Sequence, residues 1–318
     1  MTTAPTARVA VPLAHEQRAD AAAAAVLRRL LGVIEGNREG AIADVDTEFL
    51  HRLRISVRRS RTVQRQLAPV FPALELPGFR SEFRWLQRAT GEARDLDVYL
   101  LGFEDLRALV PAPVRADLGP LRQVLEHWRL TAQWEMARAV SSRRTDELLY
   151  DWEMLLESLV EMPTDDRPAA TRSIGELAGK RIRIVYKRVL RMGRAISPDS
   201  PAQAYHELRK IGKELRYLLE LFGQQLYDPD VVAPMVGSLK ALQDTLGRHQ
   251  DREVQVTMLR SLVDEVASLP RGPRAVMAMG ILIDRLAADE AAARAEFAER
   301  FARLAAAKQR RLVRETFR

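Results

Sequence analysis

The sequence predicts an all-α protein in which 318 residues form two similar antiparallel helical bundles. Gly and Pro are sparse, at 16 residues each, whereas Ala, Leu and Arg are abundant, and this balance favours helices. No stretch shows a convincing strand-like alternation bounded by turn residues. Two sequence motifs also occur twice in the same order, which indicates an internal duplication.

The duplication depends on two motifs that are displaced by nearly the same distance. The pattern His-x-Leu-Arg-x-x-x-(Arg/Lys)-x-x-Arg begins at His51 and returns at His206, about 155 residues later. The motif LQRATGEARDLDV from Leu86 returns as LQDTLGRHQDREV from Leu242 at almost the same displacement. A period this long describes two half-domains rather than a solenoid of short repeats.

Composition limits the classes of protein and of site. A hydrophobic content of 47% is enough for a full core, and the net charge of +7 indicates a polyanionic partner or an anionic surface. The absence of cysteine excludes disulfides, thiolate metal sites and cysteine nucleophiles. No segment resembles a signal peptide or is apolar enough to span a membrane, so we expect a cytoplasmic protein.

The domain organisation follows from the composition of the chain ends and of the middle. Residues 1–13 are rich in Thr, Ala and Pro, and we expect a flexible tail there. Residues 14–318 are expected to form a single domain, in which residues 14–161 are the first half and residues 170–318 the second. A short polar linker with two prolines, residues 162–169, joins them.

Helix boundaries can be predicted at several places in the first half. A helical pattern over residues 15–38 leads into an expected loop that contains Gly36 and Gly40. Asp46 or Thr47 is placed to cap the following helix, whose first histidine is that of the repeated motif.

Further along, glycine and acidic residues suggest where helices break and restart. The helical pattern after Pro77 is expected to break at Gly91 and to restart with Asp95 and Asp97 in its first turn. The segment from Val110 is expected to be a connector before two long helices.

The second half begins with an acid-free helical run from Leu177. Ser200 and Pro201 are interpreted as the N-cap and first residue of the next helix, which should continue to about Leu226. Further helices are expected to start near Asp230, Asp251 and Arg274.

Three of these helices carry rows of positive charge at spacings of three and four residues, which places each row on one helical face. The rows are His51, Arg54, Arg58, Arg61 and Arg65; His206, Arg209, Lys213 and Arg216; and Lys180, Arg183, Lys187, Arg191 and Arg194. A solvated face usually mixes signs, because opposite charges at i,i+4 stabilise a helix. We interpret the rows as anion-binding surfaces, with a merely solvated face as the alternative.

The two repeated histidines have two interpretations, as phosphate ligands and as metal ligands. His51 and His206 occupy equivalent positions in the repeat, and neighbouring arginines should keep each neutral until an anion arrives. Metal ligation is the alternative, but the chain has no His-x-x-x-His motif, and Asp95 and Asp251 are interpreted as helix caps. We therefore expect no metal and no cofactor.

Catalysis has little support in the sequence. A Walker loop, a GxSxG elbow and a paired acidic cluster are all missing, and the basic rows have no nucleophile nearby. The four tryptophans are expected to fill the core rather than to stack on bases, which disfavours a nucleic-acid partner. They are Trp85, Trp128, Trp134 and Trp152.

The repeated motifs, HRLRISVRRSR with HELRKIGKELR and the pair from Leu86 and Leu242, resemble those of CHAD domains, the conserved-histidine α-helical domains. The resemblance covers about residues 14–318. It implies pseudo-symmetric antiparallel helical bundles around a central basic groove or pore that binds long-chain inorganic polyphosphate. It also implies an association with polyphosphate granules and cooperation in trans with a CYTH-type or other polyphosphate-handling enzyme.

The resemblance also implies a set of polyphosphate-binding residues. They are His51, Arg54, Arg58, Arg61, Arg65, Arg84, Arg88, Lys180, Arg183, Lys187, His206, Arg209, Lys213, Arg216 and Lys240. The repeat is not strict, since Arg65 is matched by Glu220 and the Lys180 row has only Arg28 and Arg29 as a rough counterpart. We therefore expect the two halves to contribute unequally.

Our leading hypothesis from sequence is non-enzymatic binding of polyphosphate, with no catalytic residue. The alternatives are a metal-dependent phosphohydrolase acting on polyphosphate or nucleotides, a nucleic-acid-binding module and a histidine metal sensor. The sequence does not predict the oligomeric state or the preferred length of the polymer.

Overall fold

The computed structural model describes residues 11–197 and 199–318, and within these ranges the regular elements are helices without a β-strand. The predicted all-α fold is therefore confirmed, whereas the internal duplication remains a prediction. Of the predicted tail, residues 1–10 lie outside the described ranges and residues 11–13 have no regular structure. Among the described residues, no helix is both long and apolar enough to cross a membrane.

Among the residues that the structure describes, nine helical elements precede the linker. They are α1 (Ala19–Ile42), α2 (Thr47–Gln66), η1 (Ala68–Val70), α3 (Leu76–Ala89), α4 (Gly91–Leu101), α5 (Phe103–Ala108), η2 (Ala112–Leu118), α6 (Gly119–Val140) and α7 (Arg143–Ser158). Those after it are α8 (Ile174–Arg194), α9 (Ala202–Leu218), η3 (Leu219–Gly223), α10 (Gln224–Leu226), α11 (Pro229–Ser261), α12 (Val263–Ala267), α13 (Gly272–Leu304) and α14 (Ala307–Thr316).

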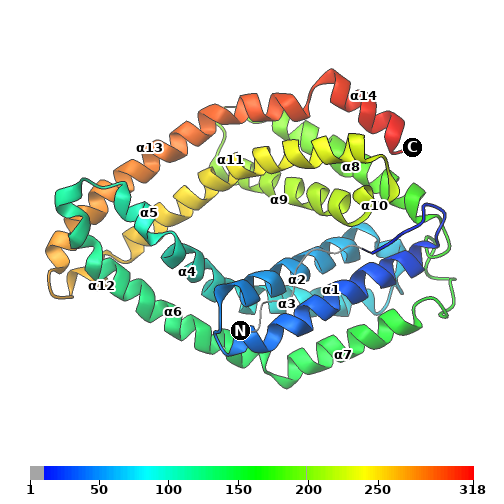
Figure 1. Ribbon diagram of the computed structural model, residues 1–318, viewed down its shortest axis with the longest axis horizontal. Coiled ribbons are helices and arrows are strands. Elements are labelled where there is room, and N and C mark those ends of the chain that lie inside the picture. The colour runs from blue at the N-terminus through cyan, green and yellow to red at the C-terminus, as the bar shows by residue number, and fades with distance from the viewer. Residues whose placement is uncertain (1–10, 198) are drawn as a thin grey trace.

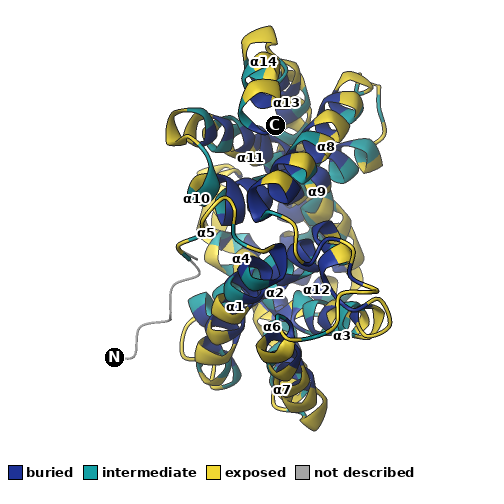
Figure 2. Cartoon of the chain, turned by 90° about the vertical axis from the view of Figure 1, so that its right-hand side faces the viewer, coloured by how far each residue is buried: buried dark blue, intermediate teal, exposed yellow. Residues whose placement is uncertain are grey.

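The helices form an elongated frame. Figure 1 shows α1, α2, α3, α6 and α7 along one long side and α8, α9, α11, α13 and α14 along the other. Elements α4, α5 and α12 lie at one end, and α2 and α9 contact each other in the middle of the molecule. Buried residues concentrate where helices meet, whereas exposed residues cover the outer turns (Figure 2). The central contact of α2 with α9 brings the two repeated His-x-Leu-Arg motifs together.

Helix α1 continues through both glycines at which a loop was predicted. The prediction of a loop at Gly36 and Gly40 is wrong, because α1 ends only at Ile42. A Cβ atom at Gly40 would overlap the ring of Phe49, so this glycine permits close packing of α1 on α2 instead of ending the helix. The predicted cap of α2 is confirmed, since the Asp46 side chain accepts a hydrogen bond from the Glu48 backbone N–H at 2.9 Å.

Two aspartates that were interpreted as helix caps lie inside helices. The predicted break near Gly91 is confirmed by the α3–α4 boundary, but Asp95 is beyond the first turn of α4, where Glu92 is the acidic residue. Helix α11 runs without interruption through Gly247 and Asp251, so no helix starts at Asp251. Each aspartate is therefore free of a capping role and projects from the middle of a helix.

The structure decides three further predictions, on the start and end of α9 and on the burial of the tryptophans. Ser200 does not cap α9, because Pro201 is the N-cap and makes no side-chain capping bond. The predicted continuation to Leu226 is confirmed, through a π-helical turn at η3 and then α10. Trp152 is fully buried as expected, but Trp134 is 59% exposed and carries the Arg138 guanidinium 4.6 Å from its ring centre.

The linker is held to the core by a buried arginine. Arg167 is 1% exposed, and its guanidinium donates hydrogen bonds to the carbonyls of Pro163 at 2.8 Å and Leu159 at 2.7 Å. It also donates to the carbonyl of Met162. These bonds satisfy a buried charge and fix the path of the chain between the two long sides of the frame.

Candidate functional site

A basic pocket lies where α2 and α9 meet. Its volume is about 380 Å³, and side chains from α2, α3 and α9 line it. The lining residues are Arg54, Arg58, Arg61, Thr62, Arg65, Gln87, Lys210, Ile211, Lys213, Glu214 and Tyr217. Five of the residues predicted for the site, four from the first row and Lys213 from the second, therefore share one pocket.

The row on α2 is partly neutralised, in contrast to the acid-free row seen in the sequence. Arg65 of this row pairs with Glu214 of α9 at 2.9 Å, and Arg59, which lies next to the row, pairs with Glu220 of η3 at 2.7 Å. Among the described residues, Arg58 and Arg61 form no ion pair. The acids that offset this row come from the opposite side of the frame, so a local sequence window could not reveal them.

Arg54 has a structural role at the pocket wall. It is only 8% exposed, and its Nη1 donates hydrogen bonds to the Gln87 carbonyl and to the Thr90 hydroxyl, both at 2.9 Å. Burial, followed by the charge of Arg58, lowers the pKa of Arg54 to about 10. Arg54 thus holds the end of α3 in place and leaves less of its guanidinium for a ligand.

Arg209 makes a similar arrangement on the other side. Its guanidinium lies against Gly247, 3.2 Å from the position that a Cβ atom would take, as Arg54 lies beside Gly91. Arg209 pairs with Asp251 at 3.4 Å, and its buried Nε has no hydrogen-bond acceptor among the described residues. At Gly247 a Cβ atom would therefore crowd the Arg209 guanidinium, whereas at Gly91 it would make only an ordinary van der Waals contact with Arg54.

Lys213 has the most perturbed charge in the pocket. Its pKa is lowered to about 7, chiefly by burial and then by the nearby charges of Arg209 and Arg58, while Asp251 acts in the opposite direction. Arg216, one turn beyond, lies 3.6 Å from Glu220 and 5.6 Å from the ring centre of Tyr217. In the absence of a ligand, the pocket thus holds one cation in partly neutral form at neutral pH.

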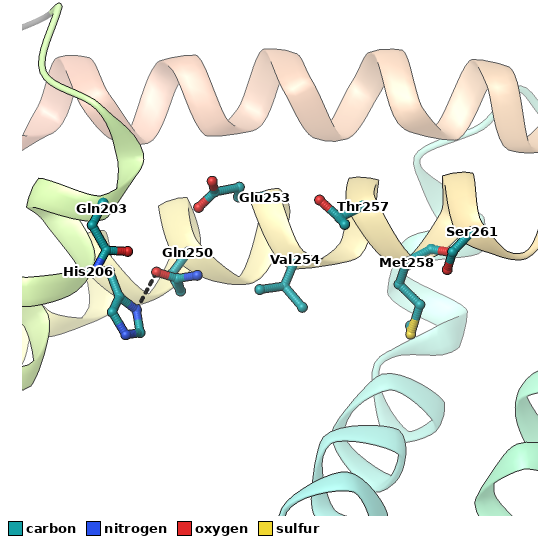
Figure 3. A pocket seen from close by; sticks show the side chains of 8 residues that line it. All are labelled: Gln203, His206, Gln250, Glu253, Val254, Thr257, Met258 and Ser261. Carbon is teal, nitrogen blue, oxygen red and sulfur yellow. Dashed lines mark hydrogen bonds between the residues drawn. The ribbon is translucent and has the colours of Figure 1, made fainter.

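The two histidines of the repeat lie at different places. Burial, followed by the charge of Arg94, lowers the pKa of His51, in line with the expectation that this histidine resists protonation. His206 shares a 2.6 Å hydrogen bond between its Nδ1 and the Gln250 Oε1 (Figure 3). It lines a neighbouring pocket of about 400 Å³ on α11, which also contains the apolar side chains of Val254 and Met258. His206 is therefore outside the basic pocket.

Asp95 and Asp251 are two further acids close to the basic rows. Burial raises the pKa of Asp95, Arg54 and Arg58 lower it, and the charge of Asp251 raises it. The two carboxylates are thus close enough to repel each other. Within the described ranges, no group of three or more His, Asp or Glu side chains is arranged to hold a metal ion.

Helix α3 extends the basic surface beyond the pocket. Arg84 and Arg88 are exposed, and their charges help to lower the pKa of Arg61, for which burial is the larger cause. Arg80, which was not predicted, has its pKa lowered by burial and then by Arg65 and Arg84. Its spacing of four residues from Arg84 was the sequence signal that could have identified it.

The remaining predicted residues lie away from the pocket. Lys180 and Lys187 are exposed on α8, Arg183 lies near Tyr227, and Lys240 is exposed on α11. The side of α8 that faces α2 instead carries Arg181, which donates two hydrogen bonds to Gln66, at 2.9 and 2.7 Å. The structure therefore does not bring the α8 row into the basic pocket.

The pocket is suited to holding oxyanions through charge-assisted hydrogen bonds. Guanidinium groups present several N–H donors in a fixed plane, and each bond to an anionic oxygen is stronger than a neutral one. Lys210, a further lining residue that was not predicted, already pairs with Glu207 at 2.7 Å. Arg58, Arg61 and Lys213 are consequently the cations best placed to meet a ligand.

Comparisons with known proteins give a consistent family and fold. A family model described as the CHAD domain matches residues 25–260. The crystal structure of the CHAD domain from the plant Ricinus communis is similar, with a TM-score of 0.79 and 25% identity over 96% of this chain and 98% of that chain. PptA from Streptomyces chartreusis shares the fold, with a TM-score of 0.66 and 18% identity over 89% and 99% of the two chains. No curated protein matches the chain.

Proposed function

Because the chain belongs to the CHAD domain family, we propose that it binds inorganic polyphosphate without transforming it. The observation that carries this proposal is the basic pocket, in which Arg58 and Arg61 of α2 meet Lys213 of α9. None of these three cations forms an ion pair among the described residues, so their charges are available to an anion. A bound polyanion would offset the repulsion between them.

The arrangement of cations suits a polymer better than a single phosphate. Arg80, Arg84 and Arg88 follow one another at four-residue steps on α3, each step about 6 Å along the helix axis. They continue the positive surface from Arg61, whose pKa the charges of Arg84 and Arg88 help to lower. A polymer with one negative charge on each interior phosphate can follow such a row without any sequence being read.

We include in this proposal an association with polyphosphate granules and cooperation with a CYTH-type or other polyphosphate-handling enzyme in trans. Both would follow from tight retention of the polymer on a protein that performs no chemistry of its own. The proposal also states that the protein does not hydrolyse or transfer phosphate from the polymer, and this part is tested together with binding.

The test is titration of the purified chain with long-chain polyphosphate at two salt concentrations, with ATP and duplex DNA in parallel. We expect polyphosphate to bind most tightly and its affinity to fall steeply with salt, because neutralised phosphates release counterions. Equal, weak binding of all three anions would refute a dedicated polyphosphate site. Preferential binding of duplex DNA would favour the nucleic-acid alternative.

The enzymatic alternative is tested with the same protein. Incubation with polyphosphate or ATP in the presence of Mg²⁺ or Mn²⁺ should release no orthophosphate above the rate of a heat-denatured sample. Release that depends on the metal would overturn the non-enzymatic part of the proposal and leave the binding part intact.

A further inference from the structure

A second strongly basic surface lies on the outside of α8 and α14. We define the outer basic surface by Lys180, Arg183, Lys187, Arg191 and Arg194 of α8 together with Lys308, Arg310 and Arg314 of α14. All of these side chains except that of Arg183 are exposed. The α8 part alone extends about 21 Å along the helix axis.

Helix α14 is fixed against α8, so the two sets of cations belong to one surface. The Tyr186 hydroxyl donates a 2.8 Å hydrogen bond to the Leu304 carbonyl just before α14, and Phe317 is fully buried. A Cβ atom at Gly179 would lie 3.2 Å from the Phe317 carbonyl oxygen, which shows how closely the C-terminus approaches α8. Figure 1 shows the two helices at the same outer corner of the molecule.

The charges of the two helices act on shared neighbours. Arg310 of α14 and Arg194 of α8 both lower the pKa of Tyr186, which burial raises to about 12. Arg183 acts in the same direction on Tyr227, whose pKa burial also raises to about 12. Cations from both helices therefore lie within electrostatic reach of the seam between them.

The outer basic surface lacks acidic partners. Among the described residues, none of its eight side chains forms an ion pair, whereas nearby Arg303 pairs with Glu299 at 2.7 Å and Arg311 with Glu315 at 3.2 Å. Like charges at i,i+3 and i,i+4 are mildly destabilising in a helix. An anionic ligand that bridges them would relieve this repulsion.

This surface is separate from the basic pocket. On α8, Arg181 faces α2 through its hydrogen bonds to Gln66, whereas Lys180 and Lys187 are exposed on another side of the same helix. The pocket is lined by residues of α2, α3 and α9, and none of its lining residues comes from α8 or α14. The chain therefore has two positive surfaces on different faces.

We propose that the outer basic surface is a second polyphosphate-binding site, so that one molecule holds two polyphosphate segments and can cross-link polymers. This inference rests on the proposed function of the basic pocket. A membrane suits the surface less well, because among the described residues of α8 and α14 the single large exposed hydrophobic side chain is that of Ile184. A regular polyanion, in contrast, needs only the row of positive charges to bind and no exposed apolar side chains.

The test compares three variants of the full chain. The outer variant is Lys180→Gln, Lys187→Gln and Arg191→Gln, all at exposed positions without an ion pair. The pocket variant is Arg58→Gln with Arg61→Gln. The matched control removes three exposed arginines on α11 and α13, through Arg260→Gln, Arg274→Gln and Arg285→Gln, and so produces the same loss of net charge as the outer variant.

Cross-linking is followed by light scattering during titration with long-chain polyphosphate, and pocket binding by titration with tripolyphosphate. We expect the wild type and the control to scatter strongly at intermediate polymer ratios and the outer variant not to. The outer variant should keep its tripolyphosphate affinity and lose about tenfold in affinity for the long polymer.

Each of the other outcomes would overturn one of the two proposals. Long-polymer affinity and scattering of the outer variant equal to those of the control would overturn the second site. Loss of duplex DNA binding by the outer variant, with polyphosphate binding unchanged, would assign the surface to nucleic acid and also overturn it. Normal tripolyphosphate binding by the pocket variant would instead refute the proposed function of the pocket, which is a separable result.

Discussion

Helices α2 and α9 carry the same repeated motif but supply opposite kinds of charge to their contact. At aligned positions, α2 has Arg58 and Arg61 where α9 has Lys213 and Arg216, so both rows are basic in sequence. In space, α9 also supplies Glu214, which pairs with an arginine of α2, whereas α2 supplies no acid to α9 among the described residues. Helix α2 therefore carries two of the three available cations, and α9 adds Lys213 together with the counter-charge that lets the two helices approach.

The difference has a simple electrostatic reason. Two rows of like charge facing each other would repel, so close contact of α2 with α9 requires acids between them. Glu214 is 3% exposed and Glu220 is also shielded, and their partners are Arg65 and Arg59. Arg58 and Arg61, which lie beside the paired arginines on α2, remain for a ligand.

The largest effect should come from removing the available cations of α2. Arg58→Gln with Arg61→Gln should lower polyphosphate affinity about a hundredfold, the loss of two charge-assisted contacts. The aligned pair of changes on α9, Lys213→Gln with Arg216→Gln, should cost about tenfold. Its effect is smaller because Arg216 already lies beside Glu220 and Lys213 is partly neutral.

Both double variants can be measured by the same titration, and their thermal unfolding should match that of the wild type. Equal losses of affinity from the two double variants would show that α2 and α9 contribute equally to binding of the polymer. A larger loss from the α9 pair would show that α9 contributes more than α2.

The packing of the first helix in each half offers a second comparison. A Cβ atom would overlap the Phe49 ring at Gly40 of α1 and the Phe301 ring at Gly193 of α8. Gly40→Ala should therefore lower the free energy of unfolding by about 2 kcal/mol, since the ring cannot move without disturbing the core. Chemical denaturation measures the change.

The matched control lies in the same helix. Gly32 has open space around its Cβ position, and Gly32→Ala should raise the free energy of unfolding by about 0.5 kcal/mol through its effect on helix propensity. If both alanine variants behave alike, the close approach of α1 to α2 does not depend on the glycine.

Most of the helices could be predicted from periodicity, whereas the errors have a common cause. Gly40 was interpreted as part of a loop and Asp251 as the start of a helix, but α1 and α11 continue through both positions. Gly40 and Gly247 are instead places where a neighbouring side chain packs on the helix backbone. A glycine needed for close approach and a glycine needed for a turn look the same in one sequence. Contacts with neighbouring helices, which one sequence does not show, therefore determine whether α1 and α11 end at such a glycine.

The site could be predicted only in part for a similar reason. Spacing on a helix identified the rows that contain Arg58 and Lys213, because a row depends on residues close in sequence. It could not show that Glu214 pairs with Arg65, or that the Lys180 row lies outside the basic pocket. Those relations depend on how distant helices are placed.

The third prediction tests the counter-charge itself. Glu214→Gln keeps the shape of the buried side chain but removes the charge that holds Arg65, so stability should fall by about 1 kcal/mol. Arg65, which is half-exposed, then becomes available to an anion, and polyphosphate affinity should rise about threefold. A lower stability together with a higher affinity in this one variant would show that Glu214 supplies counter-charge and competes with the ligand for Arg65. A fall in both quantities would show that Glu214 organises the pocket rather than competing with the ligand.

The smallest expected effect is a pH dependence that belongs to α9 alone. Lys213 is faced by Arg209 and Arg216 on its own helix, Arg58 on α2 and Asp251 on α11, and its pKa is lowered to about 7. A bound polyanion favours the charged form and raises this pKa again, so binding takes up a proton between pH 7 and the higher value of the complex.

Affinity should therefore fall about threefold between pH 7 and pH 8. Without ligand the sign is opposite, because unfolded lysine has a pKa near 10.4 and binds more protons than the folded form, so stability rises with pH over that interval. Calorimetry in two buffers of different ionisation enthalpy measures the proton uptake at pH 7.5. Lys213→Arg should keep the affinity and abolish the uptake, because arginine stays charged, whereas unchanged uptake in this variant would place the titrating group elsewhere in the pocket.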